Sequence, residues 1–208
     1  MIAVIDYGAG NLASVVNALQ RIGVPTHVTT DHDVISTADG VVFPGVGAAS
    51  DTMKHVNALG LAPVIRHVIA DGTPFLGICM GMQALMSVSL EGGEHQCLEV
   101  VPGTVRRLPC GQPVPHMGWN QVWQQQRSAL FDGIPDGAEF YFVHSYYVDP
   151  EDHSFIGATT DYSVNFASVF VRDNLFATQF HPEKSGTCGL RLLANFAQVV
   201  ATQRQRAA

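Results

Sequence analysis

The chain has 208 residues, of which 47% are hydrophobic and 14% charged, values typical of a globular protein of about one α/β domain rather than a disordered or fibrous chain. Its formal net charge is −7, and its two lysines, Lys54 and Lys184, lie far apart in the sequence. Without a basic run the chain is unsuited to follow a phosphate backbone, so we expect no nucleic-acid partner. We expect a single domain over residues 1–208.

Neither membrane insertion nor secretion is indicated by the sequence. No apolar run approaches the length of a membrane span, and the first residues lack the basic and long apolar regions of a signal peptide. The four cysteines (Cys79, Cys97, Cys110 and Cys188) contain no CxxC pair and no metal-like spacing. We therefore expect a cytoplasmic protein with reduced thiols, no membrane contact and no metal site.

The first half of the chain alternates strand and helix patterns. A strand over residues 2–6 is followed by apolar residues at helical spacing between 12 and 22. The loop between them, residues 6–11, has two glycines, as phosphate-binding loops do, but it lacks the third glycine of a dinucleotide site. Strands over 26–30, 40–43 and 73–78 and helices over 50–59 and 62–70 follow. This alternation predicts a parallel sheet whose working groups gather at the carboxyl ends of the strands.

After about residue 90 glycine, proline and β-branched or aromatic residues replace the helical pattern. Short strands are expected over 100–108, 119–123, 139–148 and 155–160, with a hairpin of 169–172 and 176–180. An amphipathic helix begins near residue 189. The sequence thus predicts an α/β fold with an open, mainly parallel mixed sheet, flanked by helices, and a β-rich second half.

The most informative stretch is Gly77-Ile78-Cys79-Met80-Gly81, which ends an apolar strand and begins a helical pattern through residue 86. It has the form of a nucleophile elbow with sulfur in place of serine oxygen. The glycines allow the strand and helix to approach closely, and a helix N-terminus favours a thiolate. The alternative is a small, inert core cysteine.

A nucleophilic cysteine needs a base, and His181 is the best placed of nine histidines. It follows a strand, and Pro182 favours extended backbone, which would project His181 and Glu183 to the same side. The carboxylate would then orient the imidazole. Six other histidines are expected at the surface, while His116 and His144, flanked by hydrophobic residues, are either satisfied core histidines or groups that face the site.

Attack on an acyl carbon also requires donors for the oxyanion. By analogy with serine elbows, one donor is the backbone N–H of Met80. A second can come from the glycine-rich loop around Val46, where Gly45 and Gly47 permit a concave arrangement of backbone N–H groups.

The assembled residues resemble the class I glutamine amidotransferases, whose glutaminase domain carries a Gly-x-Cys-x-Gly elbow and a distant His-Pro-Glu. The resemblance includes further stretches, Asp6-Tyr7-Gly8-Ala9-Gly10-Asn11, Pro44-Gly45-Val46-Gly47, Pro115-His116-Met117-Gly118-Trp119-Asn120, Phe142-Val143-His144-Ser145-Tyr146-Tyr147 and Gln179-Phe180-His181-Pro182-Glu183-Lys184-Ser185-Gly186.

This resemblance implies that Cys79 attacks the side-chain amide of glutamine, that His181 protonates the departing ammonia and that Glu183 orients His181. It implies no cofactor. The positions that match substrate-binding residues of the family are Gly45, Gly47, Gln83, Glu91, Ser145 and Tyr146. Met80 replaces the usual leucine, and Ser89-Leu90-Glu91 replaces a more acidic stretch, which leaves Glu94 as an alternative to Glu91.

The resemblance also implies a partner, because the glutaminase motifs fill the chain and leave no room for a synthase domain. The branch with the most similar motifs passes its ammonia to a separate (β/α)₈ cyclase subunit of histidine synthesis, in a heterodimer. Four residues are predicted at that interface: Asn11, Trp119, Tyr141 and Lys184. The alternatives are another amidotransferase branch, a non-catalytic regulatory subunit and a stand-alone cysteine hydrolase.

Overall fold

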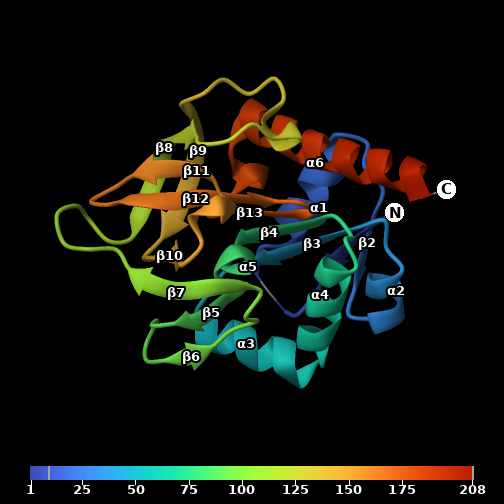
Figure 1. Cartoon of the computed structure of the whole chain (residues 1–208), viewed down its shortest axis with the longest axis horizontal. Helices are drawn as coiled ribbons and strands as arrows, with labels where there is room; N and C mark the ends of the chain where they lie inside the picture. Colours follow the sequence, from blue (N-terminus) through green and yellow to red (C-terminus); the bar gives the residue numbers. More distant parts are fainter. Residues whose placement is uncertain (9, 208) are drawn as a thin grey trace.

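The computed structural model describes residues 1–8 and 10–207, so Ala9 of the predicted loop and the last residue lie outside the described part. Strands and helices alternate in the first half and strands dominate the second, as expected (Figure 1). The strands are β1 (Ile2–Ile5), β2 (Thr26–Thr29), β3 (Gly40–Gly45), β4 (Phe75–Cys79), β5 (Met86–Ser89), β6 (His95–Gln96), β7 (Val101–Arg107), β8 (His116–Gln124), β9 (Ala138–His144), β10 (Tyr146–Pro150), β11 (Ile156–Asp161), β12 (Asn165–Arg172) and β13 (Leu175–Thr178). The helices are α1 (Leu12–Arg21), α2 (His32–Ser36), α3 (Ala49–Ala58), α4 (Leu61–Ala70), α5 (Met80–Gln83), α6 (Gly186–Ala207) and the 3-10 helices η1 (Ala129–Phe131), η2 (His153–Phe155) and η3 (Pro182–Lys184).

Five neighbouring strands, in the order β2-β1-β3-β4-β13, pair in parallel. Beyond β13 the sheet continues through β12, β10, β7, β5 and β6, where the pairing is antiparallel except between β5 and β7. Strands β11, β8 and β9 extend it from β12. The sheet is therefore mixed, and its parallel part brings the ends of β3 and β4 together, with Gly45 in register with Cys79.

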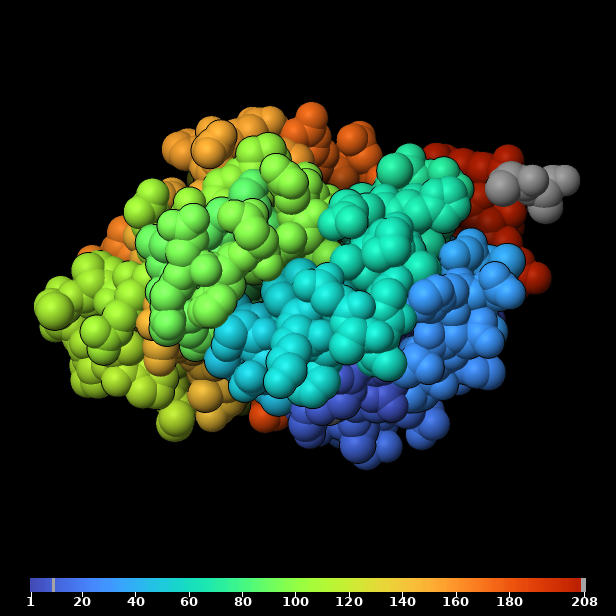
Figure 2. All heavy atoms as spheres, turned by 90° about the horizontal axis from the view of Figure 1, so that it is seen from below, coloured from blue at the N-terminus to red at the C-terminus, as the bar shows by residue number. Residues whose placement is uncertain are grey.

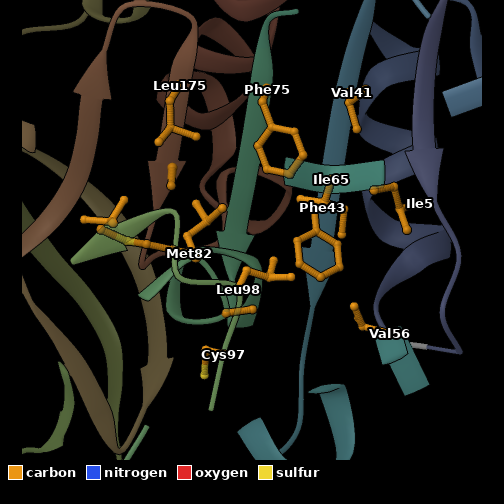
Figure 3. Close-up of a cluster of buried hydrophobic side chains, with 14 of the residues drawn as sticks. Ile5, Val41, Phe43, Val56, Ile65, Phe75, Met82, Cys97, Leu98 and Leu175 are labelled. Carbon is orange, nitrogen blue, oxygen red and sulfur yellow. The ribbon is translucent and has the colours of Figure 1, made fainter. Parts of the chain in front are cut away.

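Alternating side chains of the parallel strands form two cores, one on each face of the sheet. Ile5, Phe43 and Phe75 point toward α3 and α4 (Figure 3). Their even-numbered neighbours pack on the opposite face against α1 and α6. Figure 2 shows α3 and α4 side by side, next to the segment that carries β5 and β6. Successive residues of a strand point to opposite faces of the sheet, so one continuous apolar run supplies buried side chains to both faces.

Several predicted boundaries differ from the structure. The helix after the elbow was expected to continue through Met86, but α5 ends at Gln83 and the chain enters β5, because a short apolar run fits a buried strand as well as a helix. The strand expected over 139–148 is divided into β9 and β10 at Ser145. The short helix α2, whose N-terminus is capped by Asp31, was not predicted.

Candidate active site

Cys79 lies at the sharp turn between β4 and α5, as the elbow motif predicts. Its backbone has φ 54° and ψ −103°, a conformation that costs a non-glycine residue about 1–3 kcal/mol. A Cβ on Gly81 would come within 2.0 Å of the Phe43 carbonyl oxygen, and one on Gly77 within 2.9 Å of the Gly81 backbone. Glycine at both positions therefore permits the close approach that holds the turn.

His181 and Glu183 form a buried pair. His181 Nδ1 lies 2.7 Å from Glu183 Oε1, and neither side chain is exposed to solvent. The contact arises differently from the extended geometry expected, because Pro182 begins a 3-10 helix and Glu183 curls back beside His181. His181 Nε2, the other ring nitrogen, is buried and makes no hydrogen bond with any described residue.

The ionisation of His181 reflects competing effects. Burial alone would lower its pKa, but its interactions with Cys79 and with Glu183 outweigh burial and raise the pKa of His181 to about 10. A protonated imidazole at neutral pH is the partner that a thiolate requires.

Asn11 also belongs to this cluster. Its Nδ2 donates a hydrogen bond to Glu183 Oε1 and lies 3.3 Å from His181 Nδ1. Only 6% of Asn11 is exposed, so its side chain faces the His181–Glu183 pair rather than the surface where it was predicted to meet a partner.

A cavity of about 260 Å³ opens beside Cys79 and gathers most of the predicted site. It is lined by Val46, Gly47, Cys79, Met80, Gln83, Glu91, Val143, His144, Ser145 and Tyr146. Both predicted oxyanion residues are in this set, as are five of the six predicted substrate-binding residues. Glu94, the alternative to Glu91, is exposed and does not line the cavity.

Gly45 and Glu91 position the glycine-rich loop. A Cβ on Gly45 would lie 2.3 Å from the Tyr7 hydroxyl and 2.9 Å from Met80 Cβ, so Gly45 supports the loop from behind instead of lining the cavity. The Tyr7 hydroxyl is buried, and burial raises the pKa of Tyr7 to about 12. Glu91 Oε2 accepts a 2.8 Å hydrogen bond from the backbone N–H of Ala49, at the start of α3.

Gln179 is a site residue that sequence reasoning missed. Its Nε2 lies 3.7 Å from Cys79 Sγ, and its Oε1 accepts a 3.1 Å hydrogen bond from Gln83 Nε2. Gln83 Nε2 also donates to the Tyr146 carbonyl at 2.9 Å. A signal was available, because Gln179 precedes His181 by two residues, the spacing that brings extended residues to one side.

The predicted interface residues other than Asn11 lie together near His181. Trp119 is 54% exposed, and its ring packs edge-on against that of Tyr141 across the β8–β9 pairing, with 6.2 Å between the ring centroids. The Tyr141 carbonyl accepts from the backbone N–H of His181 at 2.9 Å, and Lys184 is exposed in the following turn. An exposed aromatic residue is thus one strand away from the His181 segment.

Within residues 1–8 and 10–207, no helix is both long and apolar enough to cross a membrane. Across the same residues, histidine, cysteine, aspartate and glutamate side chains form no group of three that would hold a metal ion.

Several known proteins and one family model are similar to this chain. The model of the family "Glutamine amidotransferase class-I" matches residues 3–199. Proteins named imidazole glycerol phosphate synthase subunit HisH are 57% identical in Chloroflexus aurantiacus (94% of both chains covered) and 53% identical in Herpetosiphon aurantiacus (98% of this chain and 96% of the relative). The structure of PurLQS from Thermotoga maritima is 16% identical, with a TM-score of 0.75 over 96% of this chain and 98% of that chain, a similarity of fold.

Proposed function

Because the chain belongs to the class I glutamine amidotransferases, and among them to the HisH subunits of imidazole glycerol phosphate synthase, we propose that it hydrolyses glutamine through a thioester on Cys79 and supplies the ammonia to a HisF cyclase subunit. One observation carries the catalytic part of the proposal. The cavity beside Cys79 is lined by both oxyanion candidates and by five of the six residues expected to hold glutamine.

In the first step the Cys79 thiolate attacks the side-chain carbonyl carbon of glutamine. A C–S bond forms, and the carbonyl electron pair moves onto oxygen, where the backbone N–H groups of Met80 and Val46 stabilise it. The tetrahedral intermediate collapses when the C–N bond breaks, and His181 donates a proton to the departing ammonia. Glu183 keeps the imidazole oriented and stabilises its protonated form.

In the second step water hydrolyses the thioester. Neutral His181 takes a proton from the attacking water, the new C–O bond forms and the C–S bond breaks. Glutamate leaves, and the Cys79 thiolate beside a protonated His181 is restored. During both steps Gly47, Gln83, Glu91, Ser145 and Tyr146 hold glutamine in the cavity, while Gly45 supports the oxyanion loop.

The ammonia is used by the partner. We propose a cytoplasmic heterodimer with HisF, in which Trp119, Tyr141 and Lys184 lie at the interface and Asn11, buried next to Glu183, acts from behind it. The cyclase would combine ammonia with a phosphoribulosyl-formimino intermediate to give imidazole glycerol phosphate and aminoimidazole carboxamide ribotide. The whole chain acts as a single glutamine amidotransferase domain, which is supported by a family match over residues 3–199.

The test is co-purification with a HisF cyclase followed by a glutamine-dependent assay. We expect little glutamate release by the isolated subunit, a large increase with the cyclase and its ligand, and none in the complex that carries Cys79→Ala. Rapid turnover without a partner would favour the stand-alone hydrolase, and binding without turnover would favour a regulatory subunit. Either result would overturn the proposal.

A further inference from the structure

Two buried histidines face each other across the β8–β9 ribbon. His116 and His144 are opposite each other in its register, and His116 Nδ1 lies 2.9 Å from His144 Nε2. The ring of His116 is stacked between those of Tyr162 and Phe142, with ring centroids 3.9 Å and 4.8 Å away. His144 also lines the cavity beside Cys79, so the pair reaches from the core to the site.

The hydrogen-bond partner at the inner end of the pair determines where His144 carries its proton. His144 Nδ1 lies 2.9 Å from the Tyr146 carbonyl oxygen, which can only accept. His144 is therefore protonated on Nδ1, and its Nε2 is an acceptor for His116 Nδ1–H. The same Tyr146 oxygen accepts from Gln83 Nε2 at 2.9 Å.

The outer end leads independently to the same proton arrangement. Asn120 Oδ1 accepts from the Gln121 backbone N–H at 2.8 Å, and Asn120 Nδ2 donates to the Asp161 carbonyl at 3.0 Å, which fixes the orientation of the amide. Asn120 Nδ2 also lies 3.3 Å from His116 Nε2. His116 Nε2 must then be an acceptor, which leaves its proton on Nδ1.

The two ends agree on one arrangement, and this arrangement has no net charge. A second proton on either ring would place two N–H groups face to face and would remove one hydrogen bond. Burial lowers the pKa of His116 to about 4 and that of His144 to about 3, the latter also under the influence of the His116 and His181 charges. A further titratable side chain, Tyr162, stacks its ring on that of His116.

We propose that His116 and His144 are positioning residues that form an uncharged hydrogen-bond relay from Asn120 to the Tyr146 carbonyl. The relay holds Gln83 and the start of β10, at Tyr146, in place. The relay continues the chain of contacts through Gln83 and Gln179 to Cys79 Sγ. Its effect on glutamine binding rests on the function proposed above, whereas its proton arrangement does not.

Nitrogen-15 NMR of the histidine-labelled chain tests the relay directly. At neutral pH both rings are expected as neutral tautomers that carry the proton on Nδ1, the less common form in water. A proton on Nε2 of either ring, or an imidazolium, would overturn the proposal. In the variant Asn120→Asp, a carboxylate oxygen replaces the Nδ2 donor that faces His116. His116 is then expected to gain a proton on Nε2, and an unchanged His116 spectrum would contradict the relay.

Kinetics of the complex with the cyclase test the positioning role. His116→Phe keeps the ring between Tyr162 and Phe142 but removes the donor to His144, so we expect the KM for glutamine to rise about fivefold while kcat changes little. The matched control Tyr162→Phe retains the stacked ring and removes only the hydroxyl, which donates to Pro113 O, and should leave KM unchanged. An unchanged KM in folded His116→Phe would reject the role. A wild-type complex that releases no glutamate would refute the proposed function but not the relay, because the NMR measurement does not depend on activity.

Discussion

The amide of Asn11 donates to Glu183 Oε1, the same carboxylate oxygen that contacts His181 Nδ1. A residue at the N-terminus of the first helix thus orients a carboxylate that is 172 positions away in the sequence. Through this shared oxygen, a change at Asn11 can alter the orientation of the His181–Glu183 pair.

Replacing Asn11 is therefore expected to impair catalysis more than folding. Asn11→Ala removes a hydrogen bond to a buried carboxylate and should lower kcat of the complex about tenfold. Asn11→Asp places a second carboxylate against Glu183 and should lower it about a hundredfold. Steady-state glutamate release gives kcat for both variants. Asn17→Ala, on the exposed side of the same helix, is the control, and equal kcat in Asn11→Ala and Asn17→Ala would contradict this role.

The raised pKa of His181 predicts the alkaline limit of activity. His181 must be protonated to serve as the acid, and because its pKa is raised to about 10, kcat/KM should stay high through neutral pH and fall only as pH approaches 10. Glu183→Gln removes a negative charge that favours the imidazolium, so the fall should move to lower pH. A pH series of both complexes measures the shift, with exposed Glu151→Gln as control. An alkaline limb at the same pH in Glu183→Gln would contradict the assignment.

The backbone of Cys79 predicts a conflict between stability and activity. At a position with φ 54°, glycine relieves strain, so inactive Cys79→Gly should be at least as stable as Cys79→Ala. In the middle of α6, by contrast, Ala197→Gly should lower the free energy of unfolding by about 1 kcal/mol. Urea denaturation compares the variants. A loss of about 1 kcal/mol in Cys79→Gly relative to Cys79→Ala would show that the turn is unstrained.

The exposed aromatic residue beside the His181 segment predicts where the cyclase binds. Trp119→Ala should weaken the affinity for HisF at least about tenfold, because exposed tryptophans that become buried contribute strongly to binding. Lys184→Ala should weaken association or uncouple ammonia transfer. Calorimetric titration with HisF provides the affinities, and Trp123→Ala, farther along β8 and 43% exposed, is the control. Equal affinity of the wild type and Trp119→Ala would reject this surface.

The turn at Cys79 was more predictable from the sequence than the connections around it. The elbow at Cys79 follows from a local pattern, because glycine spacing is a short-range signal. The His181–Glu183 contact was expected from extended backbone, but a 3-10 helix that begins at Pro182 makes it instead. The inward direction of Asn11 was not predictable in this way, since an asparagine at a helix start usually caps its own helix. Nor was the early end of α5, where the apolar run after Gln83 was equally compatible with a strand.

The histidines of the second half illustrate the same limit. The sequence left His116 and His144 open between core and site. In the structure both are buried and hydrogen-bonded, and His144 in addition lines the cavity. Strand register determines this outcome, because it places the two rings opposite each other, and register depends on pairing between distant segments.

In the proposed reaction glutamine is cleaved through a covalent bond to Cys79. Rapid acid quenching of the complex with HisF during turnover, followed by mass spectrometry of its peptides, measures that bond directly. We predict a γ-glutamyl thioester on the peptide that carries Cys79, and none in Cys79→Ala. Glutamate release that continues in Cys79→Ala, or an adduct on Cys97, Cys110 or Cys188 instead, would contradict it.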